Sequence, residues 1–91
     1  MRFIAHIYVS LKPTVNDPQG LTVLGALRNL GFTSVETARV GKYLEVSLEA
    51  PDKVAATAQV DEMCGKLLAN PVIEVYRFDL EPLRSPSRAA P

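Results

Sequence analysis

The stretch that decides the fold is MCGKLLANPVIEVY, residues 63–76, because it joins a helical pattern to a strand pattern. Asn70 is tolerated as a helix end, and Pro71 lacks a backbone N–H and disfavours a helical conformation in the residue before it. A helix is therefore expected to end at this point, and residues 72–80 are expected to form a strand. Apolar residues at helical spacing predict one buried stripe on that helix: Ala56, Val60, Met63, Cys64 and Leu67.

The first third of the chain predicts a strand followed by a helix. The odd-numbered positions from Phe3 to Leu11 are all apolar, which indicates a strand with one buried face. Asp17 and Pro18 suit the N-cap and the first position of a helix, and Gly31 suits its left-handed C-terminal residue. The apolar residues of this helix fall on one side: Val23, Leu24, Leu27 and Leu30.

The middle of the chain predicts two more strands and the start of the second helix. Residues 34–40 alternate weakly, whereas residues 43–49 alternate clearly between apolar and polar. The Gly41-Lys42 dipeptide suits a short turn between these two strands. Asp52 is the expected N-cap of the second helix.

The order strand, helix, strand, strand, helix, strand predicts an α+β fold. With right-handed crossovers it closes as a ferredoxin-like plait (βαββαβ), a four-stranded antiparallel sheet with both helices on one face. Residues 1–81 form the single predicted domain, and the Pro- and Ser-rich residues 82–91 are expected to be a disordered tail. The bare face of the sheet, or a strand edge, is expected to mediate self-association. The candidates to line the bare face are Ile4, Tyr8, Tyr43 and, depending on the strand register, Tyr76 and Phe78.

The composition excludes several classes of protein. Ten basic and ten acidic residues cancel, so the long-range attraction of a nucleic-acid or membrane binder is absent. No apolar run approaches the roughly 20 residues of a membrane span, and the N-terminal residues do not form a signal peptide. A single cysteine cannot form an internal disulfide, which favours a cytoplasmic protein.

No group of residues in the sequence predicts catalytic, cofactor-binding or metal-binding chemistry. Cys64 would need a base to act as a nucleophile, but the only histidine, His6, lies on the opposite face of the first strand from the core. We therefore interpret Cys64 as a buried core residue. One histidine and one cysteine cannot build a zinc site, and the glycine that a phosphate-binding loop requires is missing before both Gly-Lys pairs.

Three basic side chains, Arg39, Lys42 and Arg77, are open to two interpretations. They could form a small anion site or partner contact, or they could be ordinary solvated charges on strands. Tyr8 and Tyr43 lie on strands that stack bases in RNA-recognition modules, but the characteristic octapeptide is absent. An RNA-binding module and a small-molecule-binding regulatory plait domain both remain as alternatives.

Several short motifs of the sequence also resemble those of a known family. The matching segments are 10–12 (SLK), 17–20 (DPQG), 39–42 (RVGK), 62–64 (EMC) and 66–74 (KLLANPVIE), followed by Tyr76. In this order and spacing they resemble the PurS family, the small subunit of phosphoribosylformylglycinamidine (FGAM) synthase. The chain departs from the family pattern at Thr14, Asn16 and Ala38 and in its C-terminal tail.

The resemblance implies an accessory role in purine biosynthesis, in the step that converts formylglycinamide ribonucleotide to formylglycinamidine ribonucleotide. The implied partners are a glutaminase subunit and a large synthetase subunit, which together use glutamine, ATP and Mg. This chain would bridge them and assist ammonia transfer, bind no cofactor itself, and form a dimer or tetramer. The candidate partner contacts are Arg39, Gly41, Lys42, Asn70, Pro71, Glu74 and Arg77.

Overall fold

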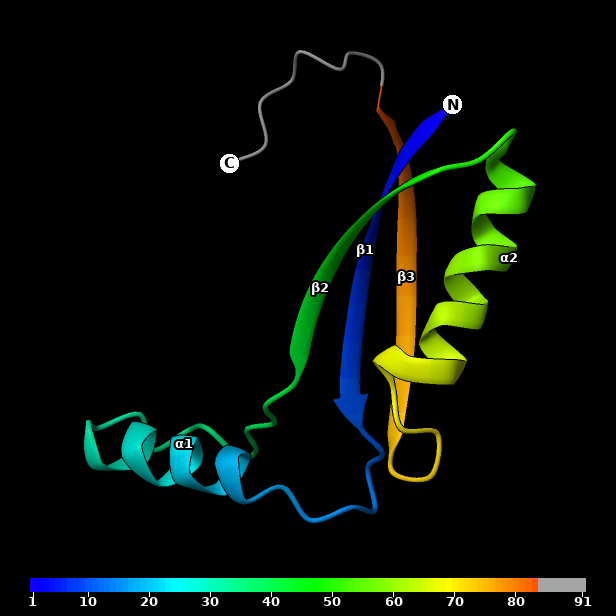
Figure 1. Cartoon of the computed structure of the whole chain (residues 1–91). Helices are drawn as coiled ribbons and strands as arrows, with labels where there is room; N and C mark the ends of the chain where they lie inside the picture. The colour runs from blue at the N-terminus through cyan, green and yellow to red at the C-terminus, as the bar shows by residue number, and fades with distance from the viewer. Residues whose placement is uncertain (84–91) are drawn as a thin grey trace.

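The computed structural model describes residues 1–83 and shows an α+β fold with a three-stranded antiparallel sheet (Figure 1). The strands lie in the order β2-β1-β3, with β1 in the centre. No helix among the described residues is long and apolar enough to cross a membrane. The elements in chain order are β1 (Arg2–Leu11), α1 (Pro18–Asn29), β2 (Lys42–Glu49), α2 (Lys53–Met63), the π-helical turn η1 (Cys64–Leu68) and β3 (Glu74–Leu83).

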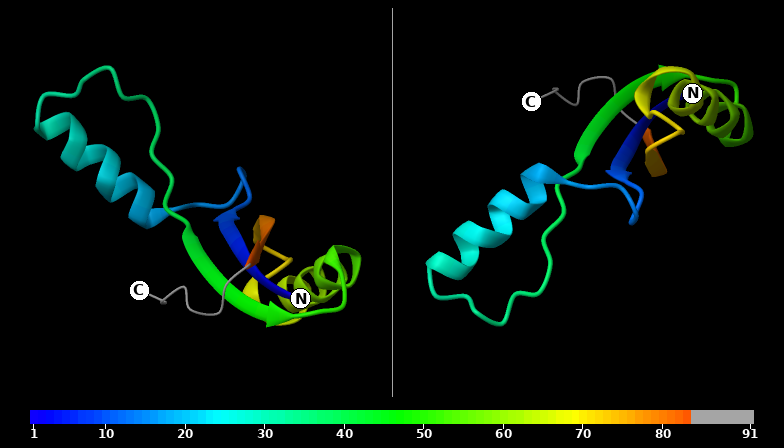
Figure 2. Two further views of the ribbon diagram at one scale, coloured as in Figure 1. Left: turned by 90° about the horizontal axis from the view of Figure 1, so that it is seen from above. Right: turned by 90° about the horizontal axis from the view of Figure 1, so that it is seen from below.

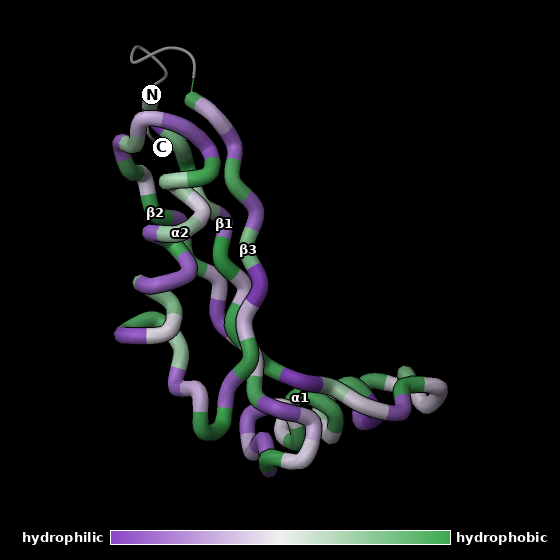
Figure 3. The backbone as a smooth tube through the Cα atoms, turned by 90° about the vertical axis from the view of Figure 1, so that its right-hand side faces the viewer, coloured by the Kyte–Doolittle hydropathy of each residue, from purple (hydrophilic) through white to green (hydrophobic). Residues whose placement is uncertain are grey.

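The core lies between the sheet and α2. As the alternation predicts, the odd-numbered side chains of β1 from Phe3 to Val9 are buried, and hydrophobic and hydrophilic residues alternate along the strands (Figure 3). Leu11, at the end of the strand, is half-buried. Val60 and Cys64 are fully buried against this face of β1, which confirms the interpretation of Cys64 as a core residue. Burial, and then the neighbouring Asp61 carboxylate, raise the pKa of the Cys64 thiol, so the thiolate is disfavoured.

Both predicted helix starts are confirmed. The Asp17 carboxylate accepts a hydrogen bond from the Gly20 N–H at 2.9 Å and caps α1. The Asp52 carboxylate accepts one from the Ala55 N–H at 2.8 Å and caps α2. Gly31 follows α1 with a φ of 102°, the left-handed conformation that favours glycine.

The predicted strand over residues 34–40 is wrong, and so is the placement of both helices on one face. Of the two helices, only α2 covers the sheet, whereas α1 projects away from it (Figures 1 and 2). Residues 30–41, which lead from α1 back to β2, lie beside α1 and away from the sheet (Figures 1 and 2). Backbone groups of residues 34–40 form hydrogen bonds with residues in or next to α1. The Arg28 guanidinium donates to the Val35 carbonyl oxygen, and the Val40 N–H donates to the Asp17 carboxylate. No neighbouring strand is within reach, so the fourth strand of a plait does not form among residues 1–83.

The C-terminal end of the second helix also differs from the prediction. The turn η1 closes with an i to i+5 hydrogen bond from the Ala69 N–H to the Cys64 carbonyl at 3.0 Å. This extra residue in the turn rotates Leu67 out of the predicted stripe, and its side chain is 82% exposed. Leu68 packs against the core in its place.

Because of the π turn, we expect truncation of Leu67 and truncation of Leu68 to have different effects on stability. Leu67→Ala should change the free energy of unfolding by less than about 0.5 kcal/mol, because little surface is buried there. Leu68→Ala should lower it by about 2 kcal/mol, because core contacts are lost. Urea unfolding of both variants measures the difference. A larger loss for Leu67→Ala would mean that the helix continues without the π turn.

The last strand is displaced along the chain from the prediction, since it begins at Glu74 instead of Val72 and ends at Leu83 instead of Leu80. It includes Pro82 and Leu83, which the sequence placed in the tail, and Leu83 lies opposite Arg2 of β1. The remainder of the predicted tail, residues 84–91, lies outside the described residues.

Candidate interaction surfaces

The face of the sheet opposite α2, here called the open face, is polar at its centre. It is formed by alternate residues of the three strands: Arg2, Ile4, His6 and Tyr8 of β1, Tyr43, Glu45, Ser47 and Glu49 of β2, and Arg77, Asp79 and Glu81 of β3. The strand register places Glu45 and Asp79 on either side of His6. Carboxylates therefore outnumber cationic groups on the middle of this face.

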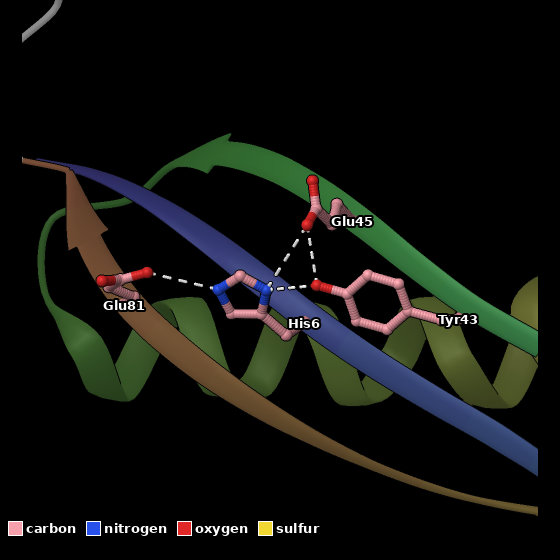
Figure 4. A network of polar contacts seen from close by, with 4 residues as sticks. All are labelled: His6, Tyr43, Glu45 and Glu81. Carbon is pink, nitrogen blue, oxygen red and sulfur yellow. Dashed lines mark hydrogen bonds and ion pairs between the residues drawn. The ribbon is translucent and has the colours of Figure 1, made fainter. Parts of the chain in front are cut away.

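A hydrogen-bonded network centred on His6 links all three strands (Figure 4). The His6 Nδ1 atom lies 2.6 Å from the Tyr43 hydroxyl oxygen, and Nε2 lies 3.2 Å from Glu81 Oε1. The Tyr43 hydroxyl donates to Glu45 Oε2 at 2.7 Å. The network thus places the His6 ring between the carboxylates of Glu45 and Glu81.

The network controls the ionisation of Tyr43. Its hydrogen bond to Glu45 raises the pKa of Tyr43 to about 12, with smaller contributions from burial and from the surrounding negative charge. The neutral phenol is the form that donates this bond. The stabilisation is therefore fully present below the ordinary tyrosine pKa of 10.0 and is lost as the pH rises through about 12.

Absorbance titration of the phenols tests this arrangement. We expect Glu45→Gln to move the pKa of Tyr43 down towards 10.0, because the carboxylate that holds the proton is removed. Tyr43→Phe identifies which phenol moves, and Glu49→Gln, on the same strand and face, is the matched control. An unchanged titration in the Glu45→Gln chain would contradict the network.

Aromatic and cationic side chains extend the open face next to this network. The Tyr8 and Tyr43 ring centroids lie 5.1 Å apart, and the Arg77 guanidinium carbon lies 4.0 Å from the Tyr8 ring centroid. Three predicted residues, Tyr8, Tyr43 and Arg77, are therefore brought together here. Ile4 lies on the same face, next to the His6 row.

Tyr76 and Phe78 do not lie on the open face, contrary to the prediction. They pair with Val9 and Ile7, whose side chains point towards α2, so both rings pack against the core. The Tyr76 hydroxyl donates to Asp61 Oδ1 at 2.6 Å and so ties β3 to α2. That bond, followed by burial, raises the pKa of Tyr76.

Most of the predicted partner contacts gather at the end of the sheet where β1 ends and β3 begins. The backbone connects these ends, since the Lys12 N–H donates to the Ile73 carbonyl at 2.8 Å. Glu74 accepts from the Asn70 N–H at 2.6 Å and lies 3.9 Å from the Lys42 ammonium. Pro71 follows in the adjoining exposed turn. These side chains form one partly exposed corner.

Two of the predicted contacts also have structural roles within the chain. A β-carbon at Gly41 would lie 2.5 Å from the Val9 carbonyl oxygen, so this position accommodates a close approach of two backbones. Arg39 donates to the carbonyls of Lys12 and Val15 at 3.0 and 3.1 Å. Its guanidinium therefore holds the loop between β1 and α1.

The arm, defined as residues 18–41, is the most unusual surface of the molecule (Figure 2). Of the residues of α1, only Gly20 is buried, and large apolar side chains along the arm are exposed: Leu21 by 60%, Val23 by 41%, Leu30 by 74% and Phe32 by 56%. The radius of gyration is 17.0 Å, compared with about 12 Å for a compact chain of this length. Two members of the apolar stripe that the sequence predicted for the core, Val23 and Leu30, are thus exposed in the single chain, whereas Leu24 and Leu27 are half-buried.

The base of the arm is fastened by Asp17, which the sequence predicts only as a helix cap. The same carboxylate that caps α1 accepts the Val40 N–H at 2.8 Å, 23 residues further along the chain. This bond, then the Gly20 bond, and then the Arg39 guanidinium lower the pKa of Asp17, and burial opposes them only in part. Stability from the ionised group is therefore present above pH 3.8 and is lost as the pH falls through the lowered pKa.

These features define a class of protein whose conspicuous surfaces suit contacts with other chains. Among the described residues, no group of three or more His, Cys, Asp or Glu side chains could hold a metal ion. The exposed arm, the charged open face and the Lys42-Glu74 corner are instead suited to binding protein.

Comparison with known proteins identifies the family. The PurS family profile, described as phosphoribosylformylglycinamidine (FGAM) synthase, matches residues 4–82. The PurS subunit of FGAM synthase from Synechocystis is 51% identical over 77 residues, which cover 85% of this chain and 77% of the relative. The structure of Thermus thermophilus PurS is 42% identical and superposes with a TM-score of 0.82, covering 92% of this chain and 100% of that one.

A further structural match comes from a multi-subunit assembly. A chain in the structure of PurLQS from Thermotoga maritima is 33% identical, with a TM-score of 0.82, and the match covers 89% of this chain and 99% of that one. The present chain belongs to the PurS family. It is a subunit of FGAM synthase and acts in purine biosynthesis.

Proposed function

We propose that this chain is the assembly subunit of a cytoplasmic FGAM synthase, which bridges a glutaminase subunit and a large synthetase subunit and assists ammonia transfer between them. The observation that carries the proposal is the similarity to a chain of the PurLQS structure over 89% of this sequence. In this proposal glutamine, ATP and Mg are used by the partner subunits. The chain itself contributes surfaces, and no cofactor binds to it.

Two surfaces support contacts with different partners. The open face carries Glu45, Asp79 and Glu81 around His6, and these carboxylates would repel the phosphates of RNA. The corner formed by Lys42, Asn70 and Glu74 lies at one end of the sheet and presents both signs of charge. A bridging subunit needs two such separate contact regions.

Self-association is the third part of the proposal, and the exposed arm supports it. Two open faces packed together would bring like-charged carboxylates against each other, which is unfavourable. Burying the apolar side chains of two arms would instead be favourable, by about 25 cal/mol for each Å² removed from water. We therefore expect a dimer held by the arms, with the polar open face left for other subunits.

Omission of the chain from a reconstituted mixture tests the assembly role. With the two partner subunits, glutamine, ATP and Mg present, we expect amidine synthesis to fall to near background when this chain is left out. Supplying ammonium directly should restore synthesis by the large subunit, because transfer is then bypassed. The chain alone should neither hydrolyse glutamine nor consume ATP. Undiminished glutamine-dependent synthesis in its absence would overturn the proposal.

A further inference from the structure

Asp17 joins the two ends of the arm through one buried carboxylate. Oδ1 accepts the Gly20 N–H at 2.9 Å, at the start of the arm, and Oδ2 accepts the Val40 N–H at 2.8 Å, at its end. The residue is only 4% exposed, so water does not compete freely for these bonds. We call Asp17, Gly20, Arg39 and Val40 the clasp.

The clasp is also sterically tight. A β-carbon at Gly20 would lie 2.3 Å from the Ala38 carbonyl oxygen and 2.7 Å from Asp17 Oδ2. The start and the end of the arm therefore approach each other more closely than any residue with a side chain at position 20 would allow. Such a contact leaves little freedom for the two segments to slide.

Beyond the clasp, few contacts constrain the arm among the described residues. The helix α1 does not pack on the sheet, and Gly20, in its first turn, is its only buried residue. Gly41 approaches the Val9 carbonyl oxygen of β1 closely, and Arg39 bonds to the Lys12 and Val15 carbonyls through a side chain that is 41% exposed. The buried Asp17 carboxylate is therefore one of the few contacts that can set the direction of the arm.

We propose that Asp17 is a positioning residue that locks the direction of the arm relative to the sheet, and that this lock is required for two arms to associate tightly. The inference rests on the proposed self-association for its second half only. A freely swinging arm would have to lose its orientational freedom on association, whereas a locked arm is already ordered.

Distances between spin labels test the lock. One label is placed at Thr33→Cys near the tip of the arm and the other at Ser47→Cys on β2, both exposed positions, and labelled chain is diluted with unlabelled chain so that distances are intramolecular. Cys64 is fully buried and should remain unlabelled in a brief reaction, which labelling of the chain without added cysteines checks. We expect one narrow distribution of distances in the otherwise unchanged chain.

Two variants break the clasp from opposite sides. Asp17→Ser keeps an N-cap residue but is too short to reach Val40, and Val40→Pro removes the donated N–H while leaving the cap intact. Both should broaden the distance distribution. Asp52→Ser is the matched control, because Asp52 caps α2 through a single bond, and it should leave the distribution narrow. Circular dichroism confirms that each variant is folded.

Sedimentation of the same variants tests the consequence. Breaking the clasp should weaken self-association about tenfold, on the scale of the entropy of fixing the backbone of roughly one more residue on association. Distributions that stay narrow in both variants would overturn the lock. Broadened distributions with unchanged association would overturn its coupling to assembly. A monomeric unchanged chain at all concentrations would overturn the proposed self-association, and the label distances would still decide the lock.

Discussion

Ile7→Ala is expected to lower the free energy of unfolding by about 3 to 4 kcal/mol, one of the largest effects expected of a single side-chain truncation among the described residues. Ile7 is fully buried at the middle of β1, and its strand neighbours Leu44 and Phe78 pack against the same core. Removing three carbons there loses transfer free energy and leaves a cavity beneath α2. Small domains are stable by only about 5 to 10 kcal/mol, so a large fraction would be lost.

Ile4 provides the matched control for this prediction. It lies on the same strand, is partly exposed, and points to the open face rather than towards α2. Ile4→Ala should therefore cost only about 1 kcal/mol. Urea unfolding monitored by circular dichroism measures both variants. Equal losses for the two would show that the open face is covered as completely as the helix face, which contradicts the fold.

Gly20→Ala, in the arm, should lower the free energy of unfolding by about 2 kcal/mol. The added carbon would lie 2.3 Å from a backbone oxygen, and relieving such a contact costs about 3 kcal/mol. The higher helix propensity of alanine returns about 1 kcal/mol of this. The strain exceeds the gain, so the start of α1 must move away from the end of the arm.

Gly25→Ala, in the same helix, should have the opposite sign. No atom lies within 4 Å of a β-carbon at Gly25, so alanine should stabilise the chain by about 0.5 to 1 kcal/mol. Thermal unfolding of the two variants side by side measures the contrast. If both substitutions stabilise the chain, the close approach at the base of the arm does not exist.

The local elements were predictable because their signals lie within a few residues. The alternation of β1 sets its buried face, and Asp17-Pro18 and Asp52 begin the two helices as expected. The stop at Asn70-Pro71 was also placed correctly, because proline cannot continue a helix. The π turn just before it was not predicted, since a one-residue change of helical register leaves no distinct sequence signal.

The candidate surfaces were harder to predict, because they depend on register and on contacts between distant residues. Tyr76 and Phe78 were predicted on the wrong face, because the face on which a strand residue lies depends on the register of its pairing with β1, which the sequence does not specify. The His6 network joins residues 37 and 75 positions apart, and the bond from Val40 to Asp17 spans 23 positions. Alternation on β1 and β2 could have suggested that His6 and Glu45 share a face.

The sequence by itself determined the family, the central strand, both helix caps and the burial of Cys64, because each depends on local residue spacing or on short motifs shared with relatives. Only the tertiary structure decided that α1 projects away from the sheet, with part of its apolar stripe exposed, and that residues 34–40 do not join the sheet. An apolar stripe predicts that one side of a helix is buried, but it does not specify which surface buries it. In the stretch from Met63 to Tyr76, the π turn likewise decided which leucine faces the core, because packing against the sheet, and not local propensity, selects the register.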